Sequence, residues 1–155
     1  MIEINVISVG NIKEKYLQDL IADYKKRISK YAIISLTELK DESNKINENT
    51  VKEIEGERII SSIKDGFYVV LLDLKGQMLD SVALSKKIDE ITTYYSSKIA
   101  FIIGGSFGVS EAVKKRANLM LCFSKMTFPH QLAKGMLMEQ IYRSFKILNN
   151  ETYHK

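Results

Sequence analysis

The chain has 155 residues, 45% of them hydrophobic, and a formal net charge of +4 at pH 7. A chain of this length buries about 70% of the surface that its unfolded form exposes, so one hydrophobic core can stabilise it without disulfides or a metal. Its single cysteine, Cys122, excludes an intramolecular disulfide, and neither a leader peptide nor an apolar run of roughly 18 residues is present, so we expect a cytoplasmic protein.

Five short apolar runs are typical of strands that are covered on both faces, and they alternate with amphipathic helical patterns. In the first half of the chain, the pattern predicts strand 2–9, helix 12–29, strand 32–39, a helix to residue 63 capped by Asn49 or Thr50, and strand 67–74. In the second half it predicts a helix to residue 95 capped by Asp80 or Ser81, strand 99–103, helix 110–117 capped by Ser110, strand 119–123 and helix 130–148.

This alternation predicts the α/β class, with a mostly parallel sheet of about five strands and helices on both faces. We expect a single domain over residues 1–155. The polar stretch 40–49 is the one segment with the composition of a flexible loop.

Three of the expected strand ends carry residues that could bind a ligand, because ligands of open α/β sheets lie at the carboxyl ends of the strands. The first is DLKG at 73–76, for which an ordinary turn is the commoner explanation. The second is GGSFG at 104–108, where glycines let backbone amides approach a ligand, although a tight turn would explain them too. Its spacing matches neither the dinucleotide nor the triphosphate fingerprint.

The third strand end is FSKMTFPHQ at 123–131, which contains the only proline of the chain. Its hydroxyls and backbone amides could bind the edge of a base, and its apolar side chains could cover the faces of that base. A proline suits the first turn of a helix, so a helix-entry loop that happens to contain His130 is the alternative.

The basic residues are concentrated in the last third of the chain. Residues 1–96 contain 14 Lys and Arg against 16 Asp and Glu, whereas residues 97–155 contain 9 against 3. This distribution fits either a solvated basic face or a patch that contacts phosphates. In the last helix, Glu139 and Arg143 have the i, i+4 spacing of an ion pair, and the apolar stripe fits core packing or contact with a second subunit.

Metal and hydrolase chemistry find little support in the sequence. The two histidines, His130 and His154, are 24 positions apart and structural zinc needs four ligands, so we expect no metal. The G-x-S-x-G elbow of serine hydrolases does not occur. The tail ends in Tyr153, His154 and Lys155, three side chains with useful chemistry, but chain ends are usually frayed.

Four stretches taken together closely resemble the ribosomal RNA large subunit methyltransferase H family, a small group of SPOUT methyltransferases. They are FIIGGSFG at 101–108, FSKMTFPHQL at 123–132, EQIYRSFKI at 139–147 and the terminal YHK. The V-G after the first strand and the KEKY that follows extend the resemblance over essentially the whole chain.

The resemblance implies a deep trefoil knot in the C-terminal part of the sheet, a homodimer and S-adenosylmethionine as the methyl donor. The implied substrate is N3 of a pseudouridine in 23S rRNA of the large subunit, methylated in the assembled ribosome.

The resemblance also implies roles for individual residues. The methyl donor would be bound by the end of the third strand and by two loops, through Leu72, Gly104, Phe123, Ser124, Lys125, Met126, Thr127 and Phe128. The catalytic residues on the substrate side would be His130, Glu139, Arg143, Tyr153 and His154, with Lys155 in the same tail.

For the reaction itself we expect direct methyl transfer, in which the proton on N3 must leave. A neutral imidazole is the natural acceptor near neutral pH, so His154 is the first candidate for accepting this proton or orienting the base, with His130 second. Arg143, Lys134 and Lys155 would hold phosphates or the negative charge that develops on the pyrimidine. The alternatives are a SPOUT methyltransferase that acts on tRNA and a non-catalytic ribosome-binding α/β module.

Overall fold

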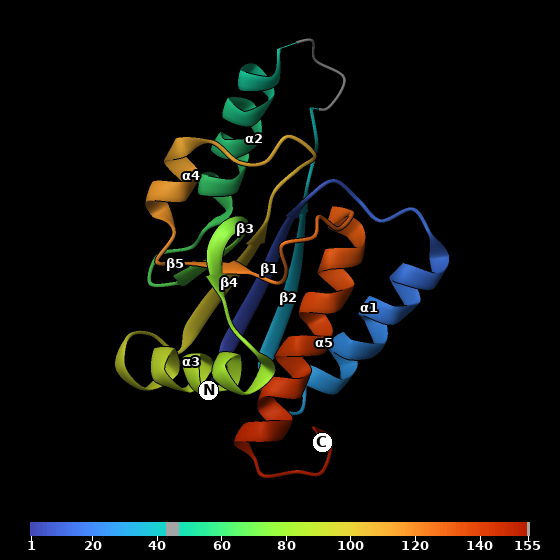
Figure 1. The fold of residues 1–155 in the computed structure, drawn as a ribbon, viewed down its shortest axis with the longest axis vertical. Coiled ribbons are helices and arrows are strands. Elements are labelled where there is room, and N and C mark those ends of the chain that lie inside the picture. Colours follow the sequence, from blue (N-terminus) through green and yellow to red (C-terminus); the bar gives the residue numbers. More distant parts are fainter. Residues whose placement is uncertain (43–46, 155) are drawn as a thin grey trace.

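The computed structural model describes residues 1–42 and 47–154. Its centre is a five-stranded sheet with the strand order β2-β1-β4-β3-β5, in which each neighbouring pair is parallel (Figure 1). The strands are β1 (Glu3–Val9), β2 (Ile33–Leu39), β3 (Tyr68–Met78), β4 (Lys98–Ile103) and β5 (Leu119–Cys122). The predicted α/β class and parallel sheet are therefore confirmed.

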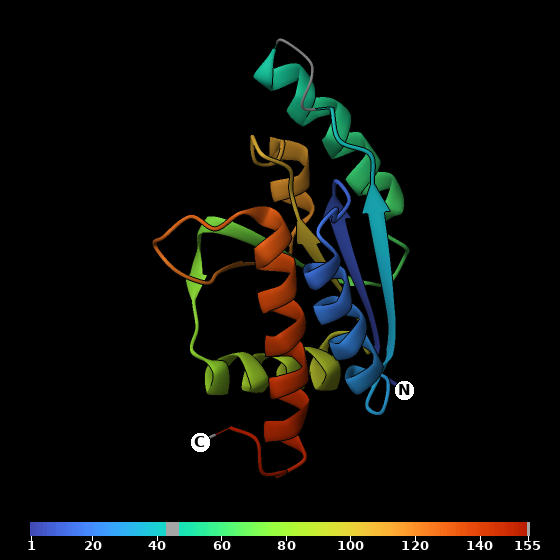
Figure 2. The same ribbon diagram turned by 90° about the vertical axis from the view of Figure 1, so that its right-hand side faces the viewer.

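Helices cover both faces of this sheet, which is why the strands are apolar at nearly every position. They are α1 (Lys15–Ile28), α2 (Glu48–Ser62), α3 (Ser81–Tyr94), α4 (Glu111–Arg116) and α5 (His130–Leu148). Side chains of α1, α3 and α5 pack with Ile4 and Val6 on one face, whereas α2 and α4 pack with Ile7 and Val9 on the other. Figure 2 shows α5 beside α1 and across α3. In the described part of the chain, no helix is long and apolar enough to cross a membrane.

Two of the predicted helix caps are confirmed and one is wrong. The Asp80 side chain accepts the Ala83 amide at 2.7 Å, and Ser110 accepts the Val113 amide at 3.4 Å. Helix α2 is capped by Asn47 instead of Asn49 or Thr50, because the Asn47 side chain accepts the amides of both these residues. Of the expected flexible loop 40–49, residues 43–46 lie outside the described residues.

Strand β3 is longer than the sequence predicts, and the extra length bends around β5. Leu121 of β5 pairs with Leu72 and again with Gln77, so β5 contacts β3 on both sides of the bend at 73–76. Within the bend, Asp73 Oδ1 accepts the backbone N–H of Lys75 at 2.8 Å. The DLKG sequence is thus not the ordinary turn of the commoner explanation but an irregularity inside β3, which returns the strand to the same partner.

Candidate functional site

The ends of β3, β4 and β5 border a cavity of about 790 Å³ at the carboxyl edge of the sheet. The cavity is lined by most of the residues expected to bind a methyl donor, namely Leu72, Gly104, Phe123, Ser124, Met126, Thr127 and Phe128. Lys125 is exposed and does not line it. The structure therefore brings together three segments that are separated by up to fifty residues in the chain, because parallel strands end at one edge of the sheet.

The glycine loop, residues 104–108, forms one wall of this cavity. The Gly108 amide donates to the Gly105 carbonyl at 3.0 Å, and Gly108 has a φ of +87°, so the loop is a tight turn as well as a cavity wall. A Cβ on Gly104 would lie only 2.5 Å from Cγ1 of Val109. Glycine at 104 therefore lets the chain turn closely over Val109 where the cavity begins.

The opposite wall is the loop between β5 and α5. Ser124 Oγ accepts the Met126 amide at 3.1 Å, and the Ser124 carbonyl accepts the Cys122 thiol at 3.0 Å. Cys122 is buried, as expected. The loop ends at Pro129, and His130, the first residue of α5, lines the cavity. Hydrogen bonds of the Ser124 hydroxyl and carbonyl therefore stabilise this wall, and the imidazole of His130 lies at its end.

Several cavity residues were not singled out from the sequence as site residues. Lys75, Phe107 and Lys114 line the cavity, and the first two lie in the DLKG and GGSFG motifs. Gly10, which has a φ of +89°, is not among the lining residues but lies beside one of them, because a Cβ there would lie 3.6 Å from Nε2 of His130. Gly10 belongs to the V-G that follows the first strand in the sequence. Its connection with the site is evident only from the structure, which places it beside this imidazole.

The remaining candidate residues gather near the far end of α5. Arg143 pairs with Glu139 at 2.7 Å and approaches Nδ1 of His154 at 3.1 Å, while its guanidinium lies 4.7 Å from the centre of the Tyr153 ring. The Tyr153 hydroxyl donates to Glu139 at 3.2 Å. The hydrogen bond that Arg143 donates to Glu139 raises the pKa of Arg143, and burial raises the pKa of Tyr153. We call these four residues the tail cluster.

The contact between Arg143 and His154 constrains the imidazole. A guanidinium has donors only, so Nδ1 of His154 must be the acceptor, which makes the ring neutral with its proton on Nε2. The one lone pair available on this ring is then already used. In this arrangement His154 can donate a hydrogen bond through Nε2.

The tail is held against the body of the protein, contrary to the usual fraying of chain ends. Tyr31 donates to Glu151 at 2.6 Å, Lys146 pairs with the same carboxylate at 3.0 Å, and the rings of Tyr142 and Tyr153 lie 5.1 Å apart edge to face. Lys155, also expected to act here, lies outside the described residues. The tail cluster is thus ordered by aromatic packing as well as by ion pairs.

The cavity and the tail cluster do not meet within one chain. His130 and Arg143 are separated by thirteen residues of the same helix, which corresponds to about 20 Å along its axis. Figure 2 shows the β5–α5 loop and the C-terminus at opposite ends of α5. The catalytic residues proposed from the resemblance therefore fall into two groups, with His130 at the cavity and the other four at a distance.

Comparison with known proteins places the chain in a family. A family model described as "Predicted SPOUT methyltransferase" matches residues 2–154. The ribosomal RNA large subunit methyltransferase H of Clostridium botulinum (strain Alaska E43 / Type E3) is 54% identical, over 98% of this chain and 99% of that protein. Proteins of the same name from Clostridium acetobutylicum and Alkaliphilus oremlandii are each 52% identical over the same shares. The chain belongs to this SPOUT methyltransferase family. The resemblance seen in the four sequence motifs is therefore confirmed.

One basic residue of this SPOUT family member is placed where it cannot contact RNA. Lys134 is 3% exposed, and its Nζ lies 3.4 Å from Glu38 of β2. The expectation that Lys134 holds phosphates is therefore wrong, because α5 turns this side chain inward to the sheet. Lys125, in contrast, is exposed next to the cavity wall.

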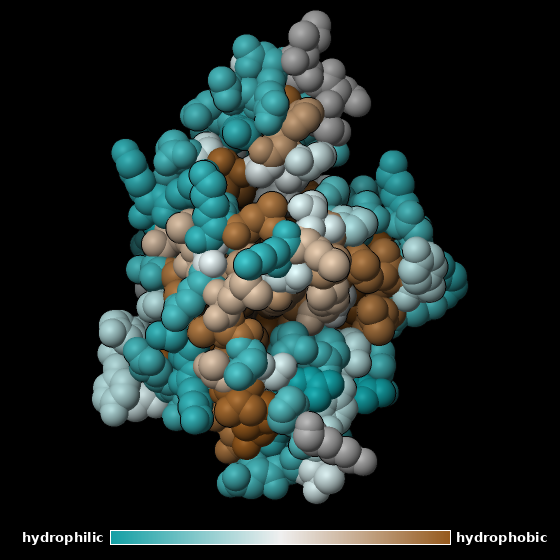
Figure 3. Space-filling model, viewed as in Figure 1, coloured by the Kyte–Doolittle hydropathy of each residue, from teal (hydrophilic) through white to brown (hydrophobic). Residues whose placement is uncertain are grey.

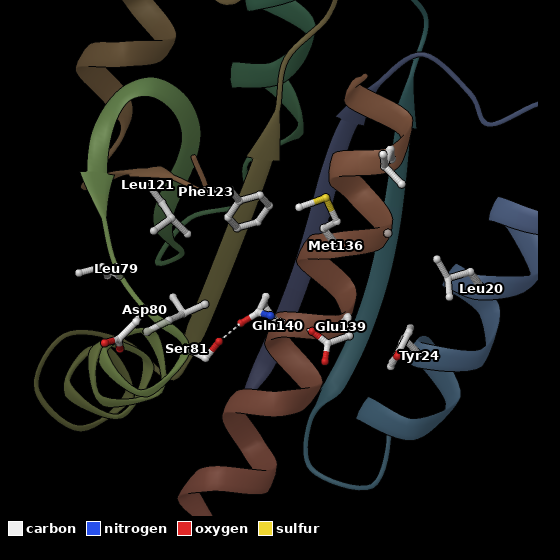
Figure 4. Close-up of a pocket in the computed structure, with 13 residues that line it drawn as sticks. Leu20, Tyr24, Leu79, Asp80, Ser81, Leu121, Phe123, Met136, Glu139 and Gln140 are labelled. Carbon is white, nitrogen blue, oxygen red and sulfur yellow. Dashed lines mark hydrogen bonds between the residues drawn. The ribbon is translucent and has the colours of Figure 1, made fainter. Parts of the chain in front are cut away.

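A second hollow, the α5 groove, lies between α1, α5 and the start of α3 (Figure 4). It measures about 460 Å³, and its apolar lining includes Leu20, Tyr24, Leu84, Leu121, Phe123, Leu132 and Met136. Ser81 donates to Gln140 at 2.7 Å across it. Phe123 lines the groove and also the strand-end cavity, so the two hollows adjoin. Figure 3 shows apolar side chains gathered across the middle of this face, with hydrophilic ones around them.

Proposed function

We propose that this SPOUT family member transfers a methyl group from S-adenosylmethionine to N3 of a pseudouridine in 23S rRNA, on the assembled large subunit in the cytoplasm. The observation that carries the proposal is the strand-end cavity, whose walls include two of the motifs on which the resemblance to the rRNA methyltransferases rests. The relatives are named for action on large-subunit rRNA, and the basic C-terminal third of this chain suits a polyanionic substrate.

The cavity has the properties that a nucleoside donor requires. Its volume falls within the 300–1,000 Å³ that is typical of small-molecule sites, and its apolar side chains stand next to exposed loop amides. We assign donor binding to Leu72, Gly104, Phe123, Ser124, Met126, Thr127 and Phe128, with the two phenylalanines covering an adenine and the loop backbone reading its edge. Lys125 faces outward and is assigned to RNA phosphates on the rim.

In this proposal His130 is the first candidate for accepting the N3 proton and His154 the second, which reverses the order that the sequence suggested. S-adenosylmethionine supplies an electrophilic methyl group on its sulfonium. His130 lines the cavity and, as a neutral imidazole, can accept the N3 proton. His154, whose Nδ1 is engaged by Arg143, is better suited to donate from Nε2 to a carbonyl oxygen of the pyrimidine. Arg143 then stabilises the negative charge that develops on the ring.

A homodimer would bring the two groups of residues together. In a dimer with two-fold symmetry, antiparallel packing of the two α5 helices places the start of each beside the end of the other. The midpoint between His130 and Arg143 is close to Met136, which lines the apolar α5 groove with Leu20 and Leu132. We therefore propose that α5 pairs with its partner across this groove, and that the tail cluster of one protomer serves the cavity of the other.

The proposal includes the trefoil knot of this family. Its support is the bend of β3, where the backbone of Gly76 passes so close to β5 that a Cβ would lie 2.6 Å from the carbonyl carbon of Met120. In the proposed knot, the chain leading to α5 leaves through the arch of β3, and the pairing of β5 with β3 before and after the bend supports this path.

Substituting two lysines tests the proposed RNA surface. Lys125→Gln is expected to weaken binding to large subunits about three- to tenfold, and to reduce the slope of log affinity against log salt by about one, because one phosphate contact is lost. The matched control is Lys134→Met, which removes a buried ammonium and is expected to leave both quantities unchanged. Filter binding between 50 and 200 mM salt provides the measurement. Equal losses in the two variants would contradict the assignment.

The function itself is tested by mapping the methylated nucleotide. The purified protein, with labelled S-adenosylmethionine, is offered assembled ribosomes, free 23S rRNA and tRNA from cells that lack this chain, and the products are mapped by mass spectrometry. Label at N3 of one pseudouridine in ribosomal 23S rRNA is the expected result. Label in tRNA would establish the other SPOUT activity, and calorimetry that shows no binding of S-adenosylmethionine would indicate a non-catalytic module.

A further inference from the structure

Glu55 of α2 is a buried carboxyl group that the proposed function leaves unused. It is 3% exposed. Its Oε2 accepts the backbone N–H of Glu42 at 2.9 Å, whereas Oε1 has no hydrogen-bond partner among the residues that the structure describes. A buried polar atom without a partner is costly, and native proteins keep few of them, so this oxygen requires an explanation.

The unpartnered oxygen points at the glycine loop. A Cβ built on Gly105 would lie 2.6 Å from Oε1 of Glu55, closer than real Cβ contacts come. Gly105 and Ser106 line the donor cavity, whereas Glu55 does not. Glu55 therefore lies behind the wall of the cavity and touches the loop from the side that faces away from a ligand.

The surroundings of Glu55 favour a new hydrogen-bond donor at Oε1. Burial raises the pKa of this carboxyl, and the negative charges of Asp41 and Glu42 raise it further. The hydrogen bond from the Glu42 backbone amide and the positive charge of Arg58 lower it. The peptide groups on either side of Gly105 can rotate at low steric cost, because glycine has no Cβ. Such a rotation would turn a loop N–H toward the carboxyl.

We propose that Glu55 is a positioning residue for the donor cavity. Its Oε1 accepts the backbone N–H of Gly105 or Ser106 when a nucleoside ligand binds. The hydrogen bond fixes the glycine loop against the ligand. The inference rests on the proposed function, since the ligand is S-adenosylmethionine or its product. It also explains why residue 105 is glycine, because any side chain there would collide with the carboxyl.

The test compares Glu55→Gln with Glu57→Gln, which changes an exposed carboxylate on the same helix. In Glu55→Gln the amide oxygen can still accept from Glu42, which leaves an NH₂ group facing the loop where an acceptor is needed. We expect the Kd for S-adenosylhomocysteine, measured by calorimetry, to rise about tenfold in Glu55→Gln and to change less than about twofold in the control. Thermal unfolding should show Glu55→Gln at least as stable as the wild type, since the lost oxygen had no partner.

Two further readouts separate positioning from a general structural role. Hydrogen exchange at residues 105–107 should slow in the wild type on adding saturating S-adenosylhomocysteine, and should not slow in Glu55→Gln. In methyl transfer, the KM for S-adenosylmethionine should rise while kcat at saturating donor changes less than about threefold. Glu55→Asp, which keeps the charge but withdraws it from the loop, should show the same pattern if Glu55→Gln does not fold.

The outcomes are distinct. Unchanged Kd and unchanged loop protection in the Glu55 variants would overturn the inference and leave the proposed function intact. A parallel loss of stability and binding would assign Glu55 a structural role only, which also overturns it. A wild-type protein that binds neither S-adenosylmethionine nor S-adenosylhomocysteine would refute the proposed function, and the inference with it.

Discussion

Arg143→Ala is expected to lower methyl transfer to ribosomes by about a hundredfold or more, with little change in the binding of S-adenosylmethionine. The guanidinium organises the tail cluster, since it contacts Glu139, His154 and the ring of Tyr153. It lies about 20 Å along α5 from His130, too far to affect the donor cavity of its own chain. Single-turnover rates and calorimetry measure the two effects separately.

The control for this substitution is Arg27→Ala. Arg27 is a half-exposed arginine of α1 that pairs with Asp23 at 3.2 Å, and its guanidinium lies over the rings of Tyr24 and Tyr142 instead of that of Tyr153. Rates close to those of the wild type are expected for it. A similar loss in both variants would show that any change in the charge of this region slows the reaction, and the specific role of Arg143 would be withdrawn.

Mixed dimers test whether the tail cluster acts on the partner's cavity. His130→Ala and Arg143→Ala should each be inactive alone, but co-expression should restore about a quarter of wild-type activity, because half of the dimers are mixed and each of those has one intact site. If the cavity and the tail cluster acted within one chain, no mixed dimer would contain an intact site. Purified mixtures without any activity would therefore contradict the proposed dimer, as would an active monomer in sedimentation.

Gly76→Ala should cost about 3 kcal/mol or more of the free energy of unfolding. A Cβ at this position would lie 2.6 Å from the Met120 carbonyl carbon and 2.7 Å from the Leu121 nitrogen. Both are backbone atoms of the paired strand β5, so they cannot move aside as a side chain would. Since the same pairing sets the positions of Leu72 and Phe123, binding of S-adenosylmethionine should be lost with it.

Gly66→Ala is the matched control for this substitution. Gly66 has a φ of +83° and no atoms within 4 Å of an added Cβ, so only backbone strain of about 1 kcal/mol is expected. Denaturant unfolding of the two variants provides the comparison. If Gly76→Ala proved no more destabilising than Gly66→Ala, the close crossing of β3 and β5 would not be the constraint proposed here.

The sequence anticipated most elements because their signals are local. Asp80 and Ser110 each cap a helix through the amide three residues away, and the apolar runs of the strands follow from burial on both faces. The donor cavity was likewise foreseeable, because parallel strand ends share one edge and Gly104 and residues 123–128 follow two of them. The proposed knot does not follow from these rules, and it was expected from the resemblance alone.

The features that the sequence missed depend on contacts between distant segments. The bend of β3 is accompanied by pairing of Leu121 with β3 on both sides of it. No pattern in the nearby sequence predicts that β3 comes back to the same strand. The sequence does not distinguish Lys134 from an exposed basic residue of an amphipathic helix. Its burial is evident only from the packing of α5 against the sheet. Glu55 carries no signal in the sequence, and only the folded chain shows that its unpartnered oxygen faces Gly105 of the glycine loop.

By itself the sequence determined the α/β class, the order of the elements and, through its motifs, the family and the residues around the donor cavity. These depend on periodicity and on residue types at strand ends, which short stretches of chain encode. Only the tertiary structure decided that α5 separates His130 from Arg143, that Nδ1 of His154 lies beside Arg143, and that Oε1 of Glu55 faces the glycine loop. Such relations depend on distances between atoms far apart in the chain, and packing in three dimensions sets those distances.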